Sequence, residues 1–133
     1  MNKKTNNNEL LAGTCLLLSI AKSDDNFEES EISVIKDIIS DFFNCNTSIL
    51  DKTISIAIKE LEKATDIYEF SKALNHSFTY QDKVDFISCT FEVAFADGTM
   101  HYLEEHFIKK IANILNVEHA DLINSKKNIQ KFL

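Results

Sequence analysis

Acidic residues recur at a matched spacing in two separate parts of the sequence. Asp24 is followed seven positions later by Glu31, and Asp97 is followed seven positions later by Glu104. Hard divalent cations bind several oxygen ligands at one point, and an aspartate on a turn followed by a glutamate on a helix supplies such ligands. We therefore predict these four residues as candidate metal ligands, with a divalent cation such as calcium as the candidate cofactor.

A structural role is the alternative for the same four acids. Glu31 and Glu104 fall where the third residue of a helix is expected, so each could complete a capping box or complement the helix dipole. Asp24 and Asp97 would then shape the turns. The first acidic segment also lacks the glycine at position six and the glutamate at position twelve of an EF-hand loop. The sequence leaves both interpretations open.

The sequence contains none of the motifs that usually accompany catalysis. It has no Gly-rich phosphate loop, no GxSxG motif and no cysteine with a nearby histidine, and its histidines show no zinc spacing. Cys15, Cys45 and Cys89 lie far apart among apolar residues, which is typical of reduced thiols in the core of a cytoplasmic protein. We expect a cytoplasmic protein that is not an enzyme.

The elements that must position the four acids are predicted to be helices. Apolar residues recur every three or four positions, and the chain contains no proline and only two glycines. Asp66 and Thr79 are the predicted N-caps of the fourth and fifth helices. The fold class is therefore all-α, a single compact bundle of about seven helices. These are predicted at about 9–22, 29–43, after 47 or 48, after 66, after 79 to about 96, 102–115 and from about 120.

The chain also resembles itself at a shift of 97 − 24 = 73 positions. This shift pairs Asp24 with Asp97 and Glu31 with Glu104, and it needs no gap. Apolar positions pair as well, for example Ile35 with Ile108. Matching of acids outside the apolar periodicity indicates duplication, so we predict an internal pseudo-two-fold repeat with two equivalent acidic corners.

Length and charge limit the domain organisation and the partners. The 133 residues suit one domain, predicted over 9–133 after a flexible N-terminus at 1–8. A net charge of −7 argues against nucleic acid, which binds clustered basic side chains. The apolar run at 10–21 is too short to cross a bilayer and lacks a cleavage signal, so we expect no direct membrane insertion. The sequence leaves open whether the chain forms a homodimer.

The second acidic corner resembles a known family. Residues 92–108 read EVAFADGTMHYLEEHFI, with an ADG turn, an acid seven positions after its aspartate, and an apolar helix. This segment resembles the TerB-like tellurite-resistance family, which is related to the amino-terminal part of the DjlA co-chaperones. The first corner, residues 21–35, looks like the second copy. Asp25 stands where that turn usually has glycine, and His101 replaces a frequent acid.

The resemblance covers residues 10 to about 127 and carries expectations about function. It implies a TerB-like helical domain over most of the chain, in a family associated with tellurite resistance and stress responses. Divalent metal binding at Asp24, Glu31, Asp97 and Glu104 is one implied activity. The alternative is a protein-interaction or co-chaperone-like adaptor, in which these acids serve only as helix caps and as a docking surface. The implied partners are proteins of a membrane-associated stress complex.

Overall fold

A computed structural model describes residues 7–22, 29–63, 67–96 and 98–132. These residues form seven α-helices and no strand. The helices are α1 (Asn7–Lys22), α2 (Glu29–Phe43), α3 (Thr47–Lys63), α4 (Tyr68–Ser77), α5 (Tyr80–Ala94), α6 (Tyr102–Ile114) and α7 (His119–Gln130). The prediction of an all-α bundle of about seven helices is confirmed.

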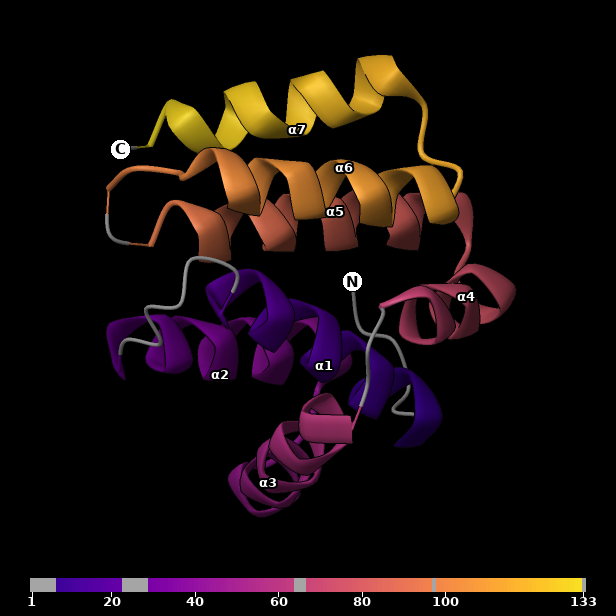
Figure 1. Ribbon diagram of the computed structural model, residues 1–133. Coiled ribbons are helices and arrows are strands. Elements are labelled where there is room, and N and C mark those ends of the chain that lie inside the picture. The colour runs from indigo at the N-terminus through magenta and orange to yellow at the C-terminus, as the bar shows by residue number, and fades with distance from the viewer. Residues whose placement is uncertain (1–6, 23–28, 64–66, 97, 133) are drawn as a thin grey trace.

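The helices form two groups that pack against each other (Figure 1). One group holds α5, α6 and α7, which run side by side, and the other holds α1, α2 and α3, with α4 at one end. Helix α1 contacts α2, α3, α4, α5 and α6, and α7 packs mainly on α5. No described helix combines the length and the apolar character that crossing a bilayer requires.

Helix α1 is central because it is apolar on nearly all sides, as expected for a helix surrounded by protein. The side chains from Leu16 to Leu18 and that of Ile20 are fully buried. Its two buried hydroxyls are satisfied within the helix, since Thr14 donates to the Leu10 carbonyl at 2.7 Å and Ser19 to the Cys15 carbonyl at 2.8 Å. Both buried hydroxyl groups therefore have a hydrogen-bond partner.

A cluster of phenylalanine rings joins the two groups of helices. Phe42 and Phe43 end α2, and their rings pack against those of Phe78 and Phe86, with centroids between 5.7 and 6.4 Å apart. Gly13 of α1 allows this packing, because a Cβ atom there would lie 2.9 Å from Cζ of Phe43. The close approach of α1 to this ring explains a glycine in the middle of a helix, where it otherwise costs stability.

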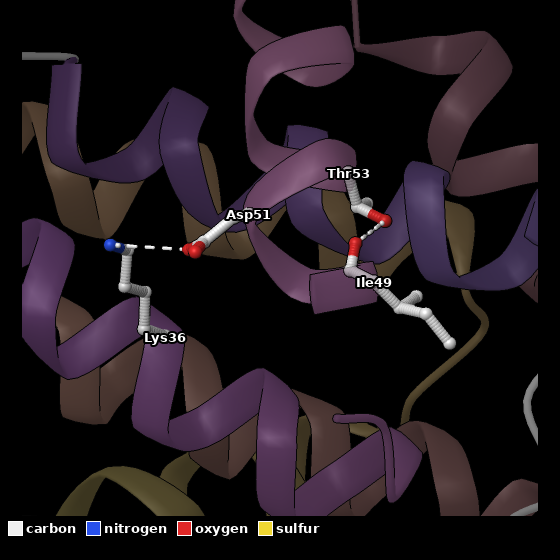
Figure 2. Close-up of polar contacts among 4 residues, drawn as sticks. All are labelled: Lys36, Ile49, Asp51 and Thr53. Atoms are coloured by element: carbon white, nitrogen blue, oxygen red, sulfur yellow. Dashed lines mark hydrogen bonds and ion pairs between the residues drawn. The ribbon is translucent and has the colours of Figure 1, made fainter. Parts of the chain in front are cut away.

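Helix α3 packs on α1 and reaches α2 through a surface ion pair. Lys36 Nζ of α2 lies 3.5 Å from Asp51 Oδ1 of α3 (Figure 2). In the same view Thr53 Oγ1 donates to the Ile49 carbonyl at 2.7 Å. Both partners of the ion pair are about half exposed, so this contact adds little stability compared with the apolar contacts of α3.

The predicted caps and repeat have mixed outcomes. Thr79 caps α5 as predicted, since its hydroxyl accepts from the Asp82 N–H. The prediction for α4 is wrong, because Ile67 and not Asp66 occupies its N-cap, without a side-chain hydrogen bond; Asp66 itself lies outside the described residues. Helix α1 begins the first predicted repeat and contacts α2 and α3. Helix α5 begins the second predicted repeat and contacts the corresponding helices, α6 and α7. The pseudo-two-fold symmetry itself stays a prediction.

Candidate functional site

The structure places two of the four predicted acids. Glu31 is the third residue of α2 and Glu104 is the third residue of α6, so both occupy the same position in their helices. Their side chains are only 4% and 2% exposed. Asp24 and Asp97 lie outside the described residues. The described part of the site is thus a pair of buried carboxylates, each at the start of a different helix.

Glu104 takes part in the start of its own helix. Its Oε1 accepts a hydrogen bond from the backbone N–H of His101, the N-cap of α6, at 3.0 Å. The first N–H groups of a helix have no partner within the helix, and a carboxylate at the third position is well placed to accept from the N-cap. This bond is the one that the capping alternative predicts for Glu104.

The same arrangement explains two further buried acids that sequence reasoning missed. Glu9 is the third residue of α1 and Asp82 is the third residue of α5, and they are 7% and 2% exposed. Asp82 Oδ2 accepts from the Thr79 N–H at 3.2 Å, and the Asp82 N–H donates to the Thr79 hydroxyl at 3.1 Å. A threonine followed three residues later by an acid is a capping-box signal, which could have identified Asp82 from the sequence.

All four buried acids in the described ranges therefore share one helical position. A charge is costly to bury unless it is hydrogen-bonded, and the start of a helix offers both N–H donors and the positive end of the dipole. This pattern gives Glu31 and Glu104 a structural reason to be acidic. Glu9 and Asp82 share this helical position although they lie outside the repeated acidic corners.

The described residues do not by themselves assemble a metal site. Carboxylate oxygens suit a hard divalent cation, but no group of three or more His, Cys, Asp or Glu side chains converges within the described ranges in a way that could hold an ion. A complete site at either corner would therefore have to include acids such as Asp24 or Asp97.

A second group of acids lies where α2 packs against α5. We call Asp41 of α2 with Asp85 and Glu92 of α5 the acidic seam. Partial burial, and then the nearby Asp41 carboxylate, raise the pKa of Glu92 above its usual value. The seam acids also act on Cys89 between them: burial first, then Glu92, Asp85 and Asp41, raises the pKa of its thiol to about 12. The seam is a place where like charges from two helices face one another.

The cysteines are free thiols without the properties of a nucleophile. Cys15 is buried, and its pKa is raised to about 12 by burial and by the charge of Glu60. Burial also raises the pKa of Cys45. Because the thiolate is the reactive and metal-binding form, these thiols stay protonated and inert at neutral pH. The prediction of three reduced cysteines agrees with their free state.

Comparisons with known proteins give one match. The family model described as tellurite resistance protein TerB matches residues 10–127. Comparisons with curated proteins and with solved structures gave no match. The matched range includes both acidic corners and nearly all of the seven helices. The chain therefore belongs to the TerB family.

Proposed function

We propose that this TerB-family chain is a non-enzymatic docking module, which binds basic segments of partner proteins through an acidic surface. The observation that carries the proposal is the acidic seam at the contact between α2 and α5, where burial and then the Asp41 carboxylate raise the pKa of Glu92. The chain as a whole carries a net charge of −7. Complementary charge increases the rate and the specificity of association.

The carboxylates of the acidic seam repel one another. Holding the Asp41 carboxylate near that of Glu92 costs free energy, which a cationic partner would relieve. A lysine or arginine side chain placed between Asp41 and Glu92 would gain from both charges at once. The seam therefore favours a basic partner over a neutral one, and the gain should weaken as salt screens the charges.

In this proposal the acids of the two corners stabilise the helix starts. Glu104 already accepts from the N-cap of α6, and Glu31 occupies the equivalent position of α2. The family resemblance supports partners in a membrane-associated stress complex, and the three free cysteines support a cytoplasmic location. Both remain part of the proposal.

The docking proposal is tested by affinity capture with matched variants. The double variant Asp41→Asn and Glu92→Gln removes two charges from the seam, whereas Asp51→Asn and Glu62→Gln removes two charges from the exposed surface of α3. We expect partners captured by the wild type to be released above about 0.5 M salt, where charges more than about 4 Å apart are screened. The seam variant should lose these partners and the α3 variant should keep them. Capture that resists salt, or equal loss in both variants, would contradict the proposal.

A divalent cation at the two corners is a second candidate function. The observation that favours it is the buried carboxylate at the same position of α2 and α6, each seven residues after an aspartate, Asp24 or Asp97. The family resemblance implies metal binding at these residues.

Calcium should raise the melting temperature if it binds the folded chain selectively. At a calcium concentration of a hundred times the dissociation constant, binding would increase the free energy of unfolding by about 2.7 kcal/mol. The double variant Asp24→Asn and Asp97→Asn should abolish this shift, whereas Asp51→Asn and Glu62→Gln should preserve it. An unchanged melting temperature at millimolar calcium would eliminate this candidate and leave the docking proposal standing.

A further inference from the structure

A pocket of about 550 Å³ lies between the first turn of α1 and one face of α4. Its lining includes Asn8 and Glu9 of α1, and Glu69, Lys72, Ala73 and His76 of α4. The four residues of α4 are spaced at three and four positions, so they share one side of that helix. Volumes of this size are typical of sites that hold small organic molecules.

The charges around the pocket favour a cation. Glu9 and Glu69 supply carboxylates from two different helices, and Glu9 is buried in the first turn of α1. Lys72 contributes the opposite charge, but its Nζ lies over the ring of Tyr68, 5.8 Å from the centroid. Tyr68 does not belong to the lining of the pocket. The ammonium group is thus drawn toward a ring outside the pocket, and the lysine stem remains as an apolar wall.

The small number of acids in the lining favours an organic cation over a metal ion. A divalent cation needs several oxygens at one point, and the described residues around this pocket form no such group. Two carboxylates that come from different helices instead suit a ligand with charge at its ends and methylene groups between them. Ala73 and the stem of Lys72 offer apolar contacts for those methylene groups.

We propose that the pocket between α1 and α4 binds a small aliphatic amine or diamine. One ammonium group lies beside Glu9, the second lies beside Glu69, and the hydrocarbon chain lies along Ala73 and Lys72. This site is separate from the acidic seam and from the two acidic corners, so its ligand neither requires nor excludes the docking function.

The test is a titration of the full ¹⁵N-labelled chain with 1,4-diaminobutane, followed by NMR through the backbone amide signals. Saturable shifts are expected at Asn8, at Glu9 and over residues 69–77. Glu69→Gln should weaken the apparent affinity at least about fivefold, because it removes one charge-assisted contact. Glu62→Gln, which removes the same charge from the exposed surface of α3, should leave the affinity unchanged. The neutral analogue 1,4-butanediol should cause no saturable shift.

Glu69 is suited to this test because its side chain is exposed. Its replacement leaves the helix start of α1 intact, so a change in affinity would not reflect unfolding. Circular dichroism of each variant verifies the fold. Shifts spread over α2 and α5, or equal weakening by Glu62→Gln, would show attraction to the negative surface in general and overturn the proposal. An absence of saturable shifts at tens of millimolar diamine would overturn it as well.

Discussion

Replacing Glu104 separates the capping role of the corner acids from a role in ligand binding. Glu104→Ala removes the carboxylate that accepts from the His101 N–H at 3.0 Å. Glu104→Gln keeps an oxygen of similar position but loses the charge. Because the side chain is 98% buried, water cannot easily replace the lost acceptor. The two variants should therefore differ in stability even in the absence of any ligand.

The expected magnitudes follow from the environment of the carboxylate. Loss of an acceptor from a partly buried bond costs about 1–3 kcal/mol, and loss of the charge at the helix start costs about 0.3–1 kcal/mol more. We expect about 2 kcal/mol for Glu104→Ala and about 0.5–1 kcal/mol for Glu104→Gln. For a chain of 133 residues, 1 kcal/mol corresponds to roughly 3–4 °C in melting temperature. The alanine variant should melt about 7 °C below the wild type and the glutamine variant about 3 °C below it.

Thermal and urea unfolding, followed by circular dichroism in a chelating buffer, measure these differences without a contribution from metal. Glu105→Ala is the matched control, because Glu105 follows in the same turn of α6, carries the same charge and is only partly buried. It forms a surface ion pair with Lys126 at 2.6 Å, worth about 0.5 kcal/mol. The excess loss in Glu104→Ala over Glu105→Ala isolates the capping contact.

Two results would refute this reasoning. If Glu104→Ala melts within about 1 °C of the wild type, the carboxylate contributes nothing to the helix start and its burial needs another cause. If Glu104→Gln is as damaging as Glu104→Ala, then the charge, and not the accepting oxygen, accounts for the effect. Because the chelating buffer excludes metal, the second result would point to the attraction between the carboxylate and the positive end of the helix dipole.

Three further predictions concern the rest of the molecule. Gly13→Ala should lower stability by roughly 1–2 kcal/mol despite the better helix propensity of alanine, because the new Cβ lies 2.9 Å from Cζ of the buried Phe43; urea unfolding checks this, and stabilisation would refute it. The pKa of Glu92 is raised in the folded chain, so ionisation of this carboxyl group lowers the stability of the fold as the pH rises. Glu92→Gln should therefore stabilise the chain by a few tenths of a kcal/mol at pH 7. Below about pH 4.5, where the wild-type carboxyl group is protonated as well, the variant and the wild type should be equally stable. Tyr80→Phe should lower the midpoint of urea unfolding, because the Tyr80 hydroxyl donates to Asp121 and links α5 to α7; an unchanged midpoint would contradict this.

The sequence by itself determined the helices and much of the core. Apolar spacing at three and four positions fixes which side of a helix is buried, since that side must leave water wherever the helix packs. Ile35 and Ile108, at equivalent places of the predicted repeat, are both fully buried. The sequence also predicted Thr79 as the N-cap of α5, because a capping box depends on residues only three positions apart. Local chemistry of this kind does not depend on the rest of the chain.

The tertiary structure decided which acids are buried and which of them meet. Sequence spacing selected Glu31 and Glu104 but not Glu9, although all three hold the same helical position and become buried by packing. The Asp41 carboxylate acts on Glu92 only because α2 packs on α5. In the same way Glu9 meets the face of α4 only because that helix packs on α1. Burial and like-charge contact depend on groups far apart in sequence, and only the packed chain brings them within the few ångströms over which such interactions act.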